Sequence, residues 1–119
     1  MSYLLLAEAQ IKTSDFSGAA TSINAVRIRA NATPITPAEA TLDYVLDERA
    51  RELYGEELRR HTLVRMGKLL DRVRTLNDFS DEYIHDYNVL WPIPQAAIDQ
   101  NIGAELTQNP GENYQQITK

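Results

Sequence analysis

The segment from residue 47 to residue 68, DERARELYGEELRRHTLVRMGK, constrains the fold more than any other stretch of the chain. Its apolar residues recur every three to four positions, as on one face of a helix, but charges of both signs stand between them. Glu48 and Glu52 are four residues apart, so they share a helix face. Two interpretations remain open: a partly buried network in which arginines join two helices, or an exposed helix whose ion pairs each contribute ~0.5 kcal/mol or less. Spacing alone favours the exposed helix.

Similar stripes elsewhere predict that the chain is helical almost throughout. Residues 3–12 are apolar on nearly all sides, so we expect this helix to be buried on more than one face. Ser14 or Asp15 can cap a second helix that ends near Asn31. Residues 1–31 are therefore predicted to form an antiparallel helix pair, similar to one tetratricopeptide unit.

Residues 36–76 are predicted to form a second helix pair, which carries most of the charge. Thr36 and Glu39 have the spacing of a capping box, and a proline occupies the first helical position between them. We expect the helix that starts there to reach Gly55, where it either ends or kinks. Another helix is expected over residues 58–76.

Residues 77–119 are predicted to form a loop-rich tail. Pro92 and Pro94 favour an extended backbone, and Asn-Pro-Gly at residues 109–111 is typical of a turn. The length of 119 residues suits one domain. The predicted fold is thus a single all-α domain over residues 1–119, with tetratricopeptide-like helix pairs and an irregular C-terminal segment.

Composition excludes several classes of function. The net charge is −5, and eight of the twelve Lys and Arg residues lie within residues 47–74 beside six acids, so we expect no nucleic-acid partner. The chain has no cysteine, which excludes disulfides and cysteine-ligated metals. Its apolar runs are shorter than the ~18 residues of a membrane span, and its first residues do not have the pattern of a signal peptide.

The residues that could support catalysis or metal binding do not form a convincing site. Glu48 and Glu52 could act as the carboxylate pair of a glycosidase, but neighbouring arginines would hold both ionised, so neither suits a general acid. His61, His85 and Asp86 could bind a metal, although their spacing better fits ordinary surface roles. Neither a phosphate-binding glycine loop nor a serine nucleophile motif is present. We therefore predict that the chain is not an enzyme, with no catalytic residue, no metal and no cofactor.

Four motifs, in order along about 110 residues, together resemble the SusD/RagB family. INAVRIRA, near residue 27, resembles one family motif, and LWPIPQAAIDQN and LTQNPG resemble two closing motifs. The charged segment resembles the family's signature helix pair. Its matching positions are Glu48, Arg49, Arg51, Glu52, Leu53, Glu56, Arg59, Leu63, Arg65, Gly67 and Lys68.

The chain also departs from the family pattern at specific positions. Many members have glycine where Glu57 stands, and an aromatic pair where this chain has Arg60 and His61. These differences are typical of a subgroup that keeps the fold. We assign a structural role to seven residues of the signature: Glu48, Arg49, Arg51, Glu52, Arg59, Arg65 and Gly67.

The resemblance implies a nutrient-binding protein of the outer membrane. Members of the family are lipid-anchored at the cell surface, capture oligosaccharides and pass them to a SusC-type TonB-dependent transporter. Members are several times longer than 119 residues, so we expect this chain to be the C-terminal part, with the lipid anchor and most of the glycan site upstream. This part is then mainly scaffold and docking surface. The alternative is a free-standing helical-repeat module that binds a protein or peptide.

The positions of glycan contacts are not evident from the sequence. Trp91, Tyr87 and Tyr83 are the candidates, because aromatic rings serve as platforms for sugars and these three lie outside the helical stripes. Trp91 also has apolar neighbours on both sides, which favour a role as a loop anchor in the core.

Overall fold

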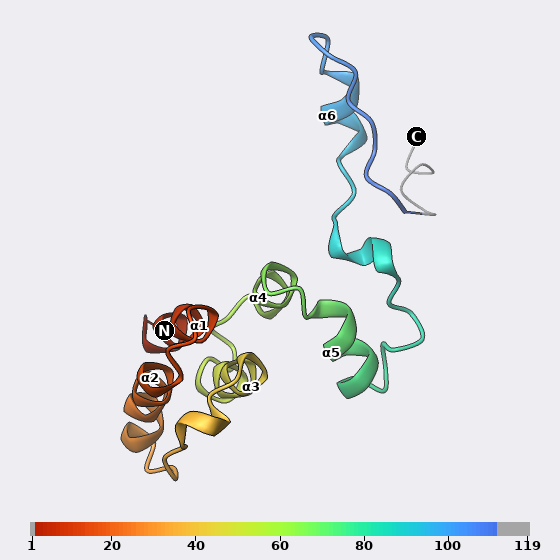
Figure 1. The fold of residues 1–119 in the computed structure, drawn as a ribbon. Coiled ribbons are helices and arrows are strands. Elements are labelled where there is room, and N and C mark those ends of the chain that lie inside the picture. Colours follow the sequence, from red (N-terminus) through yellow and green to blue (C-terminus); the bar gives the residue numbers. More distant parts are fainter. Residues whose placement is uncertain (1, 112–119) are drawn as a thin grey trace. The chain divides into compact units, whose positions relative to one another are not determined.

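The computed structural model describes residues 2–111, so the end of the predicted tail lies outside the described residues. The described residues form helices and no strand, which confirms the all-α fold (Figure 1). The chain divides into two compact units, Met1–Arg59 and Arg60–Lys119. The single domain stays a prediction. Between residues 2 and 111, every helix is too short or too polar to cross a bilayer.

The first unit opens with an antiparallel helix pair. Helix α1 (Ser2–Lys12) is joined to α2 (Phe16–Arg29) by a tight turn in which Ser14 takes a φ of 64°. This left-handed residue lets the amide of Asp15 bind the carbonyl of Gln10 at 2.8 Å and close the end of α1. The Asp15 carboxylate then accepts the Gly18 amide at 2.9 Å and caps α2, as one of the two predicted caps.

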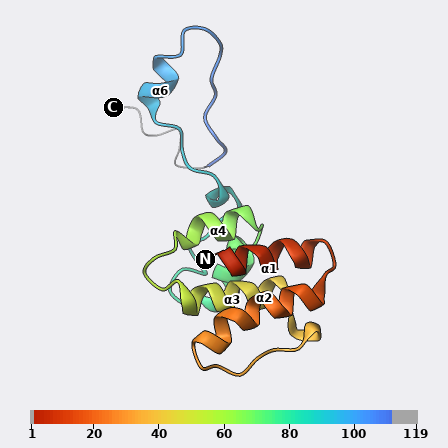
Figure 2. The same ribbon diagram turned by 90° about the vertical axis from the view of Figure 1, so that its left-hand side faces the viewer.

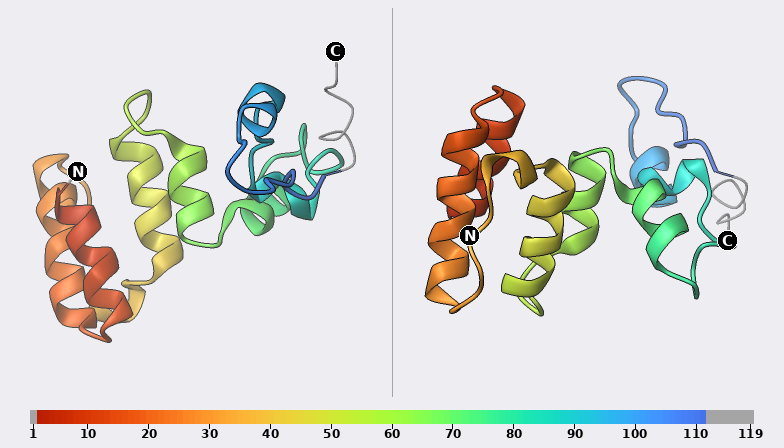
Figure 3. Two further views of the ribbon diagram at one scale, coloured as in Figure 1. Left: turned by 90° about the horizontal axis from the view of Figure 1, so that it is seen from above. Right: turned by 60° about the horizontal axis from the view of Figure 1, so that its bottom comes forward.

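Helix α3 (Leu42–Glu52) packs beside this pair, as Figures 2 and 3 show. Small residues on α1 and α2 allow the helices to approach closely, and aliphatic side chains fill the remaining space. The core consists of Leu4, Ala7, Ala19, Ala20, Ile23, Val26, Ile35, Ala40 and Val45.

The expected burial of α1 on more than one face is wrong for the described residues. Leu4 and Ala7 are buried, whereas Tyr3, Leu5 and Leu6 are each about half exposed. The reason is geometric, because α2 and α3 contact α1 through the face that carries Leu4 and Ala7. The other apolar residues of α1 remain at the surface.

The helix predicted to start at residue 36 is interrupted. The capping box forms, since the Thr36 amide donates to Glu39 Oε2 at 2.8 Å, but it starts only the 3₁₀ turn η1 (Pro37–Glu39). Ala40 then leaves the helical conformation and inserts into the core, and the Thr41 hydroxyl accepts the Tyr44 amide to cap α3. The break therefore places a small apolar residue in the core and supplies a second cap.

The helix predicted over residues 58–76 is also divided, into α4 (Arg59–Arg65) and α5 (Leu69–Leu76). Gly67 separates them with a φ of 68°. Its amide binds the carbonyl of Val64 at 3.0 Å, and the amide of Lys68 binds that of Leu63 at 2.8 Å. This pattern is a Schellman motif, which ends α4 because glycine adopts the left-handed conformation at little cost.

The rest of the second unit contains a second 3₁₀ turn, η2 (Asp86–Val89), and the short helix α6 (Gln95–Asp99), as labelled in part in Figure 1. Two closing motifs that lie far apart in the sequence meet here. The Gln108 side chain accepts the amide of Ile93 at 2.7 Å and donates to its carbonyl at 2.8 Å. Asn109 donates to the carbonyl of Trp91 at 2.8 Å. The predicted irregular tail is thus fixed by side-chain amides over residues 91–109.

Candidate functional site

Glu48 is the centre of the first cluster of motif charges, within the first unit. It lies on α3 and is only 4% exposed. Its Oε2 accepts from Arg27 Nη1 at 2.8 Å and from Arg51 Nη2 at 2.6 Å. Arg27 comes from α2, so its guanidinium joins two helices, and its Nε also holds the carbonyl of Thr33 in the following loop at 2.6 Å. This carboxylate therefore fixes α2, α3 and the loop between them.

Tyr44 completes this cluster from one turn earlier on α3. The guanidinium carbons of Arg27 and Arg51 lie 5.6 and 5.8 Å from the centre of its ring, a distance that suits cation–π contact. The hydrogen bond to Glu48 is the main reason that the pKa of Arg51 is raised above its ordinary value. Both guanidiniums thus have partners within the chain.

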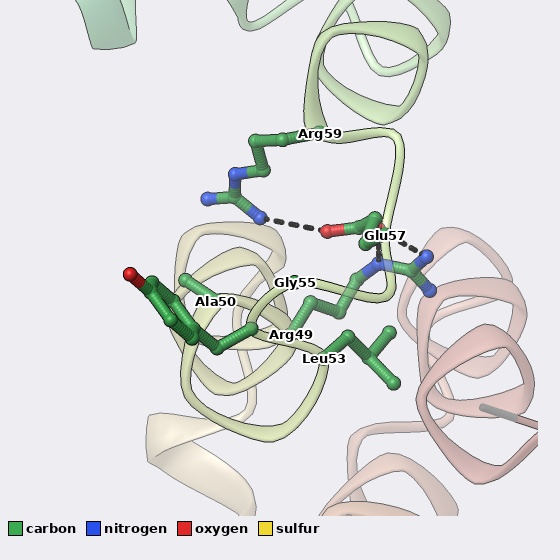
Figure 4. A pocket seen from close by; sticks show the side chains of 7 residues that line it. Arg49, Ala50, Leu53, Gly55, Glu57 and Arg59 are labelled. Atoms are coloured by element: carbon green, nitrogen blue, oxygen red, sulfur yellow. Dashed lines mark hydrogen bonds and ion pairs between the residues drawn. The ribbon is translucent and has the colours of Figure 1, made fainter.

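Glu57 is the centre of a second cluster (Figure 4). Its carboxylate lies between Arg49 and Arg59: Oε1 accepts from Arg49 Nε at 2.6 Å, and Oε2 from Arg59 Nη1 at 3.4 Å. Arg59 also donates to the carbonyl of Leu46 on α3 at 2.9 Å. The loop that follows α3 is therefore fastened back onto that helix by charge-assisted hydrogen bonds.

A pocket of about 310 Å³ opens beside this cluster, lined by Arg49, Ala50, Leu53, Tyr54, Gly55, Glu57 and Arg59 (Figure 4). Arg49 is 3% exposed, and its Nη1 has no hydrogen-bond partner among the described residues. The pocket holds two guanidiniums and one carboxylate already bound to both. This set of groups suits positioning of helices better than proton transfer, which requires a carboxyl free to exchange a proton with substrate.

The remaining signature residues lie outside these two clusters. Glu52 pairs with Arg29 at the surface, where the arginine side chain is 66% exposed. Arg65 is exposed, which at this position agrees with the interpretation of an exposed helix rather than a partly buried network. Gly67 serves the backbone by ending α4. The structural assignment of the seven residues stays a prediction, with geometry that suits it at Glu48, Arg49 and Arg59.

The three aromatic candidates do not share one site. Trp91 is 64% exposed rather than buried as a loop anchor, and the Arg60 guanidinium lies 4.5 Å from the centre of its ring. Tyr83 lines a separate hollow of about 170 Å³, which shares Arg60 with the Trp91 pocket. Tyr87 stacks on His85 with ring centres 5.2 Å apart. No group of three metal-binding side chains exists within residues 2–111.

Sequence reasoning missed several residues that hold these elements. Arg27 was recognised only as part of a motif, and Glu57 only as a departure from the pattern. Asn24 was likewise only a motif position, yet its side chain accepts the Ile35 amide at 2.7 Å and donates to the Ile35 carbonyl at 2.9 Å. The only signal for Glu57 is its place between arginines at residues 49 and 59, and Glu52 and Glu56 share that place, so the sequence alone does not single it out.

Comparison with known proteins gives a match at the level of the family. A family model described as the SusD family matches residues 2–111, which include all four motifs. This finding confirms the resemblance drawn from the sequence. Neither a curated protein nor a solved structure matches the chain.

Proposed function

Because the chain belongs to the SusD family, we propose that it is part of a surface lipoprotein that passes oligosaccharides to a SusC-type TonB-dependent transporter. Membership implies glycan binding in nutrient uptake, and the family consists of binding proteins rather than enzymes. In our proposal this segment is mainly scaffold and docking surface. The lipid anchor and most sugar contacts lie elsewhere in the protein, and the location is the cell surface of the outer membrane.

One observation supports the scaffold role above the others: the buried charges of the signature are bound within the chain. Glu48 is held by Arg27 and Arg51, and Arg49 is held by Glu57 through Nε and Nη2, so that among the buried atoms of these groups only Arg49 Nη1 is without a partner in the described residues. A sugar-binding site instead presents polar groups whose hydrogen bonds are completed by the ligand. The signature therefore fits a device that fixes helices, and it fits a ligand site poorly.

The docking role is supported by the surface of α1. Tyr3, Leu5 and Leu6 are apolar or aromatic, exposed and close together in sequence on one helix. Apolar residues that gather on a surface often mark an interface. The family match favours a transporter as the partner over the alternative of a free-standing repeat module.

The first experiment measures capture of the transporter. The tagged chain is incubated with a detergent-solubilised SusC-type protein, and retained transporter is quantified. A double variant, Leu5→Asp with Leu6→Asp, is expected to lose retention, because two charges on an apolar interface are costly to desolvate. Ile102→Asp, at a position that is 99% exposed in the other unit, is the matched control. Undiminished retention by the double variant, with helix content intact by circular dichroism, contradicts docking through α1.

The second experiment asks whether the main glycan site lies in this segment. Calorimetry of the 119-residue chain against a panel of neutral oligosaccharides is expected to show no micromolar binding. Micromolar binding that Trp91→Ala abolishes would place the principal site here and overturn the assignment of this segment as scaffold.

A further inference from the structure

A second pocket lies in the second unit, and the scaffold role assigns no function to the residues that line it. Its volume is about 200 Å³, and it lies between α4 and the end of η2 together with the residues that follow it. The described residues that line it are Arg60, His61, Val64, Arg65, Val89 and Trp91. They combine two guanidiniums, an imidazole, one indole ring and two aliphatic side chains.

The charge of this pocket is opposite to that of the whole chain. The net charge of the protein is −5, yet no carboxylate stands among the described residues that line the pocket. Arg60 Nε is buried and has no hydrogen-bond partner within residues 2–111, although the same guanidinium donates to the carbonyl of Asn88. His61 offers an N–H donor in either protonation state. Arg65, which has an interaction of its own within the chain, adds a second positive charge to the lining. Such a set selects an anion.

Trp91 provides the apolar part of the pocket. Arg60 lies over the ring at 4.5 Å, and the side chain is still 64% exposed, so a large ring surface faces solvent. An indole held in place by a guanidinium is a flat platform with a fixed orientation. A ligand that matches the whole pocket therefore needs a flat apolar face and an anionic group within reach of the arginines.

We propose that this pocket binds an acidic sugar: a pyranose ring that stacks on Trp91 and carries a carboxylate or a sulfate that contacts Arg60 and His61. The inference rests on the proposed function, from which the glycan class comes, and it assigns a weak second subsite for acidic oligosaccharides to this segment.

The single tryptophan of the chain makes the test specific, because its fluorescence reports on this pocket alone. The 119-residue chain is titrated with trigalacturonate, with a carrageenan disaccharide that carries sulfate but no carboxylate, and with neutral galactotriose, all at constant ionic strength. We expect a saturable change with at least one acidic sugar and a Kd of the order of 1 mM, which suits a few contacts in an open pocket. Galactotriose should bind at least ~5-fold more weakly, since a charge-assisted hydrogen bond is stronger than a neutral one. The two acidic ligands distinguish carboxylate from sulfate.

Variants locate the binding by ligand-observed NMR, which does not depend on the indole. Trp91→Ala and Arg60→Gln should each weaken acidic-sugar binding at least ~5-fold, because loss of an aromatic contact or of a charged donor has an effect of this size. Phe79→Ala and Arg74→Gln are matched controls outside the pocket, and binding by them should change less than ~2-fold, since exposed side chains contribute little. Circular dichroism verifies that all four variants keep their helices.

Three outcomes overturn the proposal, and the first two are no saturable response to either acidic sugar and equal binding of the neutral one. Binding that survives both Trp91→Ala and Arg60→Gln also overturns it. None of these results affects capture of the transporter through α1, so failure of the pocket and failure of the proposed function are distinguishable.

Discussion

The two units achieve order by different means. In the first, the charged clusters of Glu48 and Glu57 lie against a packed apolar core formed by three helices. In the second, only Thr62, Leu63 and Leu69 are buried among the described residues, and the chain is held by side-chain amides and by Arg60. Both units use hydrogen bonds and ion pairs of similar kind, but these bonds are more buried in the first unit. Burial determines how much each bond contributes to stability.

The same arrangement, here called an amide clamp, occurs in both units and makes this difference measurable. In an amide clamp, one side-chain amide binds both the backbone N–H and the backbone carbonyl of one isoleucine. Asn24 binds both the amide and the carbonyl of Ile35, and Gln108 does the same to Ile93. The four distances lie between 2.7 and 2.9 Å. Ile35 belongs to the buried core, whereas Ile93 is only half buried. Two clamps of equal geometry therefore stand in unequal environments.

The largest effect is expected from Glu48→Ala in the first unit. This change leaves the Arg27 guanidinium, whose side chain is 15% exposed, without its carboxylate. Breaking a buried ion pair by removing one partner costs about 3–5 kcal/mol, and we expect about 3 kcal/mol here because Arg51 is solvated. Denaturation in urea, followed by far-ultraviolet circular dichroism, measures the loss.

Glu52→Ala is the matched control on the same helix. Its partner Arg29 is mostly exposed, so the loss should stay below ~1 kcal/mol. Glu105→Ala, at an exposed position in the second unit, should cost still less, since an exposed carboxylate seldom contributes to stability. Equal and small losses of unfolding free energy in all three variants would indicate that the charged segment is a solvated surface.

The two amide clamps provide the next comparison. Asn24→Ala should cost about 2 kcal/mol, because two hydrogen bonds are lost and the buried amide and carbonyl of Ile35 are left unpaired. Gln108→Ala should cost below ~1 kcal/mol, since water can reach the groups of the half-buried Ile93. The urea midpoint gives the first value, and Trp91 fluorescence follows the second unit separately. A larger cost for Gln108→Ala contradicts the idea that burial sets the energy.

The sequence predicted helix content well because stripes and caps are local signals. The helices of the first pair end within about two residues of the predicted limits. The Asp15 carboxylate accepts the Gly18 amide as a helix cap, and the Thr36 amide donates to Glu39 as a capping box requires. The single helix predicted over residues 58–76 is divided at Gly67. The apolar residues keep their helical spacing on both sides of this left-handed glycine, so the sequence pattern gives no sign of the break.

The candidate site was harder to predict, since its partners are distant in sequence. Glu48 finds Arg27 across 21 residues, and Gln108 finds Ile93 across 15. Nothing in the periodicity of one helix says which residue of another faces it. Glu57 was misjudged for a related reason: a departure from a family pattern looks neutral until its neighbours Arg49 and Arg59 are seen around it.

A smaller effect is expected from the residues that end helices. The first unit ends α1 with Ser14 in the left-handed conformation, whereas the second unit ends α4 with Gly67 in the same conformation. Gly67→Ala should cost about 1 kcal/mol from backbone strain, because no atom lies within 4 Å of the added Cβ. Ser14→Gly should gain a few tenths to ~1 kcal/mol for the same reason. Thermal melts of both variants test the pair, and a loss of stability in Ser14→Gly contradicts it.

The smallest effect concerns pH, and it separates two turns of similar design. In η1 the Thr36 amide donates to the Glu39 carboxylate at 2.8 Å, and in η2 the His85 amide donates to the Asn88 side-chain oxygen at 2.7 Å. Only the first acceptor titrates. The hydrogen bonds from the Thr36 amide and hydroxyl lower the pKa of Glu39 below its ordinary value of 4.5.

A lowered pKa in the folded state means that the stabilisation by Glu39 is complete above the unfolded pKa and is lost as the pH falls through the folded one. Protonation of Glu39 below pH 4.5 should therefore loosen η1, whereas the Asn88 side-chain amide that accepts from His85 in η2 does not titrate. NMR titration of the Glu39 carboxyl carbon measures the pKa directly. Thr36→Val removes the hydroxyl donor and should move that pKa part of the way back, since the amide donor remains and is the larger cause. Glu39→Gln gives the first turn an acceptor of the kind found in the second, so amide exchange at Thr36 should then lose its dependence on acid. A Glu39 pKa at or above 4.5 contradicts the prediction, because the Thr36 hydrogen bonds would then not favour the charged carboxylate.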